Sequence, residues 1–101
     1  MTDTPDTKMI TITVKSFATL REVMEAQARV DLPGGATIRT LLDRLTRQYP
    51  GLDEQLFSAP GTLRDLVNVL RNGRNIAFLA GLDTPLSDGD LVALFPPVAG
   101  G

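Results

Sequence analysis

The sequence predicts an α+β domain in which a mixed sheet of four or five strands packs on one main helix. Apolar and polar residues alternate along 9–15 and again along 27–32, which is the pattern of half-buried strands. Residues 38–49 instead carry apolar residues at helical spacing, and 91–95 form a last strand-like run. A chain of 101 residues with 43% hydrophobic residues suits one such domain with a modest core.

The first third of the chain predicts an arm followed by a long hairpin. Residues 1–7 are polar and offer nothing to bury, so we expect a flexible N-terminal arm. The two alternating strands then pair with each other, and Pro33-Gly34-Gly35 ends the second one. The connection between them, 16–25, fits a loop with one helical turn. Its apolar residues are Phe17, Leu20 and Val23.

Residues 37–49 give the clearest helix. Thr37 is a suitable N-cap, and Pro50-Gly51 ends the helix. The stripe expected to face the core consists of Ile38, Leu41, Leu42, Leu45 and Tyr49. The opposite side carries Arg39, Asp43 and Arg47 at a spacing that allows charge pairs. These three residues could form a binding site, but we favour a solvated face.

The segment after the helix is less regular. Residues 52–65 show no clear period, although Leu52, Leu56 and Phe57 could cover one end of the core. This segment leaves open whether a second helix is present.

Two short strands are predicted next. Residues 66–71 lead into Asn72-Gly73, a hairpin-turn signal because both residues tolerate positive φ. Residues 74–79 then return as a short strand through Ile76 and Phe78.

Composition excludes several classes of chemistry. The chain has no cysteine and no histidine, so thiol nucleophiles, disulfides and the commonest acid–base group are excluded. A net charge of −2 argues against a nucleic-acid partner. No apolar run approaches the roughly 18 residues of a membrane span, and the N-terminus lacks a signal peptide's apolar stretch. We therefore expect a cytoplasmic protein without a membrane partner.

Two further patterns suggest ligand sites but have simpler interpretations. Pro33 to Thr37 opens a helix as a phosphate loop does, yet it lacks the lysine and glycine spacing of such a loop, so a turn plus N-cap is favoured. Asp83, Asp88 and Asp90 lack the glutamate of a calcium loop. We interpret them as turn residues and expect no metal site.

The chain ends with a distinctive tail, Pro96-Pro97-Val98-Ala99-Gly100-Gly101. Proline cannot donate to a sheet ladder and holds φ at about −65°, so residues 96–101 are expected to leave the sheet as an extended segment. Glycine has no Cβ and can thread through a narrow channel. The terminal carboxylate gains a leaving group when it is joined to AMP, and a sulfur donor can then convert it to a thiocarboxylate.

The run from Gly89 to Gly101 resembles the end of the MoaD/ThiS family of ubiquitin-like sulfur carriers. Its pattern, GD-x-V-x-x-F-P-P-V-x-G-G, is most similar to MoaD, the small subunit of molybdopterin synthase. The stretch 63–86 is similar instead to CysO-type carriers and archaeal ubiquitin-like modifiers. The resemblance covers 9–101 and implies a ubiquitin-like β-grasp domain, 8–95, between the arm 1–7 and the tail.

The resemblance also implies roles for the tail residues. Gly101 would be adenylated and thiocarboxylated. Six residues would contact partner proteins: Phe95, Pro96, Pro97, Val98, Ala99 and Gly100. The chain itself would be a non-catalytic carrier with no bound cofactor, since ATP and magnesium would belong to an E1-like adenylating enzyme of the MoeB/ThiF type. A MoaE-like large subunit, or another sulfur-accepting enzyme, would be the second partner.

Four functions remain open on the sequence. The first is sulfur donation for molybdopterin, and hence molybdenum cofactor, biosynthesis, as the small subunit of a molybdopterin synthase-type sulfurtransferase. The second is a CysO- or ThiS-like carrier for cysteine, homocysteine or thiamine-thiazole synthesis. The third is a ubiquitin-like modifier conjugated through Gly101. The fourth is a plain interaction domain in which Gly100 and Gly101 have no chemical role.

Overall fold

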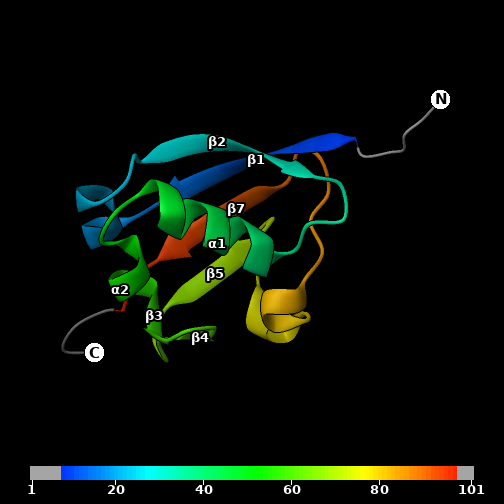
Figure 1. Ribbon diagram of the computed structural model, residues 1–101. Coiled ribbons are helices and arrows are strands. Elements are labelled where there is room, and N and C mark those ends of the chain that lie inside the picture. The colour runs from blue at the N-terminus through cyan, green and yellow to red at the C-terminus, as the bar shows by residue number, and fades with distance from the viewer. Residues whose placement is uncertain (1–7, 98–101) are drawn as a thin grey trace.

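A computed structural model of the protein describes residues 8–97, in which a five-stranded sheet lies against one long helix (Figure 1). The spatial order of the strands is β2-β1-β7-β5-β6. Their bounds are β1 (Met9–Ser16), β2 (Gln27–Pro33), β5 (Asn68–Arg71), β6 (Arg74–Asn75) and β7 (Leu91–Phe95). The helix is α1 (Ile38–Gln48). The expected α+β class, with a mixed sheet on one main helix, is confirmed.

The last strand lies at the centre of the sheet. β1 pairs with β2 in antiparallel register, as the predicted hairpin requires, with Ile12 opposite Val30. β7 pairs with β1 in parallel and with β5 antiparallel, so both of its edges are hydrogen-bonded. Because a central strand is anchored on two sides, the point at which the chain leaves the sheet is fixed at Phe95.

The core lies between α1 and the sheet. The stripe expected on the helix is buried at Ile38, Leu41, Leu42 and Leu45, while Tyr49 is only partly buried. Facing residues of the sheet are fully buried as well: Ile12, Val14, Leu32, Val92 and Leu94. Burial of one such leucine or isoleucine side chain contributes about 1.5–3 kcal/mol. The alternating strands and the helical stripe therefore form one common core.

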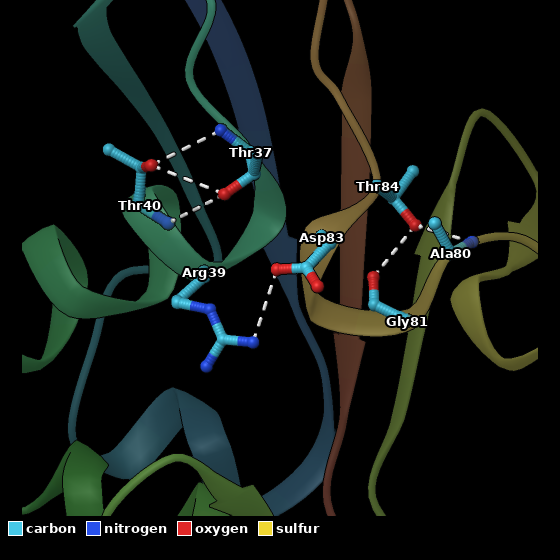
Figure 2. Close-up of polar contacts among 7 residues, drawn as sticks. All are labelled: Thr37, Arg39, Thr40, Ala80, Gly81, Asp83 and Thr84. Carbon is cyan, nitrogen blue, oxygen red and sulfur yellow. Dashed lines mark hydrogen bonds and ion pairs between the residues drawn. The ribbon is translucent and has the colours of Figure 1, made fainter.

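Thr37 caps α1, as predicted. Its Oγ1 accepts a hydrogen bond from the Thr40 amide at 3.4 Å, and Thr40 Oγ1 accepts one from the Thr37 amide at 3.2 Å (Figure 2). This reciprocal arrangement is a capping box in which a threonine replaces the usual acidic or amide residue. The favoured interpretation of Pro33 to Thr37, a turn plus N-cap, agrees with these contacts.

A short 3₁₀ helix, η3 (Gly81–Asp83), packs beside the start of α1. The buried Thr84 closes it, because its Oγ1 donates to the Gly81 carbonyl at 2.7 Å and accepts from the Ala80 amide at 3.1 Å (Figure 2). Asp83 of this helix lies 3.2 Å from Arg39 of α1. The segment between β6 and β7 is thereby attached to the N-terminal end of the helix.

Asp90 connects the start of β7 to the turn between β5 and β6. Its carboxylate accepts hydrogen bonds from Arg71 Nε at 2.7 Å, the Ser87 amide at 2.8 Å and Asn72 Nδ2 at 2.9 Å. Asn72 and Gly73 have φ values of 50° and 86°, as the predicted hairpin turn requires. Asp90 therefore occupies a turn, as expected, but also joins two turns that are distant in sequence.

The strand predicted at 74–79 is wrong beyond Asn75. β6 ends there, and Ile76–Phe78 forms a 3₁₀ helix, η2. The cause is local, since Asn75 Oδ1 accepts a hydrogen bond from the Ala77 amide at 2.9 Å and so favours a turn over a ladder. Phe78 is consequently 82% exposed instead of buried.

The strand predicted at 66–71 begins two residues late, at Asn68, and Leu66 is 58% exposed. The Val67 amide donates to the Arg64 carbonyl at 3.1 Å, so residues 64–67 form a turn in front of the strand.

The irregular segment 52–65 contains a short helix and a two-stranded ribbon. The helix is α2 (Leu52–Leu56), and the ribbon consists of β3 (Phe57–Ala59) and β4 (Thr62–Leu63). Leu52 and Leu56 are fully buried, which confirms that they cover one end of the core. The predicted turn after β1 is the 3₁₀ helix η1 (Ala18–Glu22), and its Leu20 is buried.

Candidate functional site

The candidate site is the end of β7, where the chain leaves the sheet. Along this strand Val92 and Leu94 face the core, whereas Leu91, Ala93 and Phe95 are half-buried on the outer face. Pro96 follows and is buried, and Pro97 is half-buried. The chain is thus still packed against the domain at the first proline. The position of Pro96 is determined by β7, the central strand that it follows directly.

Phe95 stacks on a second aromatic residue. The ring of Phe17, which follows β1, lies with its centroid 4.4 Å from that of Phe95 and is inclined to it by 7°. The guanidinium carbon of Arg21 lies 5.3 Å from the centre of the Phe17 ring. A phenylalanine pair and a cation therefore gather where the tail begins.

The reactive end predicted from the sequence lies outside the described residues. Val98, Ala99, Gly100 and Gly101 belong to that part, so their roles stay predictions. Of the six residues expected to contact partners, the structure places Phe95, Pro96 and Pro97 together at the end of β7.

The charged candidates on α1 have structural partners. Arg39 pairs with Asp83 at 3.2 Å, and Arg47 pairs with Asp43 at 3.1 Å; all four side chains are largely exposed. Exposed pairs of this kind contribute at most about 1 kcal/mol. These contacts fit the favoured interpretation of a solvated face.

Two hollows in the described surface are lined by residues of other segments than β7. One of about 210 Å³ lies beside Arg39, Phe57, Pro60 and Leu82. An apolar one of about 240 Å³ lies beside Leu63, Val67, Ile76 and Leu82. Neither is lined by a residue of β7.

Residues 8–97 contain no cluster of three or more acidic residues that could hold a metal ion. Among the helices of this part of the chain, none is both long and apolar enough to cross a membrane.

Known proteins are similar to this chain in both sequence and fold. The family model described as the ThiS family matches residues 14–101. This chain belongs to the ThiS family. Its members are ubiquitin-like sulfur carriers and modifiers, and the β-grasp fold implied by the tail motif is confirmed.

Two curated members of the ThiS family illustrate how functions differ among similar proteins. Small archaeal modifier protein 3 of Haloferax volcanii is 44% identical over 91 residues, which cover 87% of this chain and 96% of that protein. The molybdopterin synthase sulfur carrier subunit of Mycobacterium tuberculosis is 35% identical over 95 residues, which cover 92% of this chain and all of that protein.

Solved structures extend the similarity to three dimensions. The Haloferax volcanii HVO 2177 protein superposes with a TM-score of 0.83 at 39% identity and covers 98% of this chain and 93% of its own. The Amycolatopsis orientalis BexX/CysO complex contains a chain that matches with a TM-score of 0.72 at 29% identity, over 89% of this chain and 99% of that one. Family members therefore include a carrier that was crystallised with a partner protein.

Phe17 and Arg21 belong to the site, although no pattern in the sequence indicates it. The spacing of Phe17 predicts only a helical turn, and nothing near Arg21 in the sequence marks it as functional. Both lie more than 70 positions from Phe95, so no local pattern could reveal the contact. The contact could be predicted only together with the strand order. Phe17 directly follows β1, and parallel pairing of β1 with β7 places the end of β1 beside the end of β7.

Proposed function

We propose that this chain is a sulfur carrier that donates sulfur for molybdopterin, and hence molybdenum cofactor, biosynthesis in the cytoplasm. The observation that carries the proposal is the path of β7. The central strand leads directly into Phe95-Pro96-Pro97, and Val98-Ala99-Gly100-Gly101 follow in the sequence. A segment that begins at a fixed strand end and continues with small residues is suited to carry a carboxylate into another protein's active site.

The chemistry would proceed in two steps at Gly101. Its carboxylate oxygen attacks the α-phosphorus of ATP, which forms an acyl adenylate and releases pyrophosphate. A donor of sulfur at the oxidation level of sulfide then attacks the acyl carbon, the bond from that carbon to AMP breaks, AMP leaves, and a thiocarboxylate remains. An E1-like enzyme of the MoeB/ThiF type would bind ATP and magnesium and carry out the adenylation.

The choice of molybdopterin rests on the tail motif, Phe95-Pro96-Pro97-Val98 followed by two glycines, together with the similarity to the molybdopterin synthase subunit. A MoaE-like large subunit would then receive the sulfur. A CysO- or ThiS-like acceptor, for cysteine, homocysteine or thiamine-thiazole synthesis, would use the same carrier chemistry.

A second candidate function is protein modification through Gly101. The observation that favours it is the 44% identity with a small archaeal modifier protein, which exceeds the 35% identity with the molybdopterin synthase subunit. In this case the activated carboxylate would pass to a lysine of a target protein and form an amide bond.

Intact-mass analysis of the chain, co-expressed with its own activating enzyme, tests the proposal. A mass increase equal to the replacement of one oxygen by sulfur is expected. Branched peptides in which Gly101 is joined to a lysine of another protein, without this shift, would support the modifier instead. If neither product forms, Gly101 is not activated and only an interaction domain remains.

Affinity capture separates the acceptors. Retention of a MoaE-like subunit supports molybdopterin synthesis, whereas selective retention of an enzyme of cysteine or thiazole synthesis contradicts that destination. The capture uses the full chain and, as control, a chain from which Gly100 and Gly101 are deleted.

A further inference from the structure

The end of β7 is held from one side by the residues that follow β1. Ser16 lies opposite Leu94 in the parallel register, and the Phe17 amide donates to the Leu94 carbonyl at 3.2 Å. The ladder between β1 and β7 thus extends as far as the last residues of β7. This extension brings Phe17 beside Phe95, where their rings stack at 4.4 Å.

The conformation of the chain next to Phe17 is itself constrained. Ala18 has a φ of 54°, a left-handed conformation that is uncommon for a residue other than glycine. At this point the chain leaves the ladder and enters η1. Such a conformation persists only where the surrounding contacts fix it.

Arg21 supplies one of these contacts. Its Nε donates to the Ser16 carbonyl at 2.9 Å, and its guanidinium lies over the Phe17 ring. The aromatic ring is therefore in contact with Phe95 and with a cation that is itself hydrogen-bonded to the backbone. Together these contacts restrict the orientation of the Phe17 side chain.

These contacts hold Phe95 in place, and Phe95 with Pro96 forms the root of the tail, the point at which the chain leaves the sheet. Phe95 is paired with Asn68 on its other side, and the buried Pro96 follows it directly. Because proline fixes φ, the orientation of residues 95 and 96 sets the direction in which the chain continues. We infer that Phe17, held by Arg21, is a positioning residue that directs the tail and thereby presents the Gly101 carboxylate to the activating enzyme. The consequence for catalysis rests on the proposed function.

Kinetics of the activating enzyme test the inference. Pyrophosphate release is measured with ATP at saturation and increasing concentrations of Phe17→Leu, which keeps an apolar side chain but removes the stack. A misdirected carboxylate is expected to lower kcat roughly tenfold or more, with KM little changed. Phe17→Tyr, which preserves the ring, is expected to restore kcat. An effect on KM alone would mean that Phe17 only contacts the enzyme, and would overturn the inference.

Two control variants separate positioning from general damage. Phe78→Leu makes the same change at an exposed site on η2, and Thr37→Ala weakens the cap of α1, which lies in another part of the fold. With both variants the activating enzyme is expected to show the same kcat as with the unmodified chain. If Thr37→Ala, at a similar loss of thermal stability, lowers kcat as much as Phe17→Leu, the effect is one of stability and the inference is wrong.

A measurement on the chain alone is independent of the proposed function. Amide relaxation by nuclear magnetic resonance reports the order parameters of Val98 and Ala99. They are expected to be lower in Phe17→Leu than in the unmodified chain and unchanged in Phe78→Leu. Equal values in the unmodified chain and Phe17→Leu overturn the inference. If the unmodified chain is not adenylated at all, the proposed function fails, while relaxation still decides whether Phe17 directs the tail.

Discussion

Arg71 Nε lies 2.7 Å from Asp90 Oδ2, and this ion pair joins the end of β5 to the start of the central strand. Burial by itself raises the pKa of the Asp90 carboxyl. Hydrogen bonds from Arg71, the Ser87 amide and Asn72, together with the charge of Arg71, outweigh burial and hold the pKa below its ordinary value. The folded protein thus favours the ionised form of Asp90.

The first prediction concerns acid stability. The pKa of Asp90 is lower in the folded than in the unfolded chain. Its contribution to the free energy of unfolding is therefore present above pH 3.8, the ordinary pKa, and is lost as the pH falls through the folded-state pKa. Asp90→Asn is expected to lower the free energy of unfolding at neutral pH by about 1.5–3 kcal/mol and to flatten its fall in acid. Urea denaturation at several pH values measures both effects.

Asp65→Asn is the control for Asp90, since Asp65 is exposed. An Asp90→Asn variant with the stability and acid response of Asp65→Asn would contradict a structural role for the ion pair.

The second prediction concerns the core. Leu42 on α1 is fully buried, so Leu42→Ala removes apolar contacts and leaves a cavity. The free energy of unfolding is expected to fall by about 2–5 kcal/mol. Gln48→Ala, at an exposed position of the same helix, is expected to change it by at most about 0.5 kcal/mol. Equal midpoints of thermal unfolding for the two variants would mean that the face of the helix was assigned wrongly.

The third prediction concerns Tyr49, the only tyrosine in a chain without tryptophan. Burial raises its pKa above 10.0, and the nearby charge of Glu25 and its hydrogen bond at 3.3 Å raise it further. The protonated phenol is therefore favoured in the folded state. The contribution of Tyr49 to the free energy of unfolding is present below pH 10.0 and is lost as the pH rises through the raised pKa.

Glu25→Gln tests that coupling. The pKa of Tyr49 is expected to fall but to stay above its ordinary value, because burial remains. Alkaline titration of the phenolate absorbance measures it, with Glu22→Gln as the control. A pKa that does not respond to Glu25→Gln would exclude the electrostatic coupling.

The fourth prediction concerns the tail. Deletion of Gly101 is expected to leave the midpoint of thermal unfolding unchanged, because the core is formed by residues from β1 to β7. The deletion is expected to abolish formation of the thiocarboxylate, as read by intact mass. Sulfur transfer by the shortened chain would contradict the entire carrier scheme.

Local patterns were sufficient for much of the fold. Strict alternation identified β1 and β2, helical spacing identified α1, and Thr37 and Asn72-Gly73 marked a cap and a turn. These signals are reliable because each one depends on neighbours within a few residues. The end of β7 was predicted for the same reason, since an apolar run meets two prolines there.

The short strands in the second half of the chain were predicted less well. At 74–79 the apolar spacing favoured a strand, but the side chain of Asn75 closes a turn and leaves Phe78 exposed. Here one side-chain hydrogen bond outweighs a weak β preference, and spacing alone does not report it.

The sequence by itself determined β1, β2, α1 and β7, the core stripe and the tail motif that resembles the family. Only the tertiary structure decided which distant residues surround the root of that tail. Phe17 meets Phe95 because β7 inserts beside β1, and Arg71 meets Asp90 because β5 lies on the other side of β7. Such contacts depend on the order of strands in the sheet, which is set by packing of the complete core and not by neighbours along the chain.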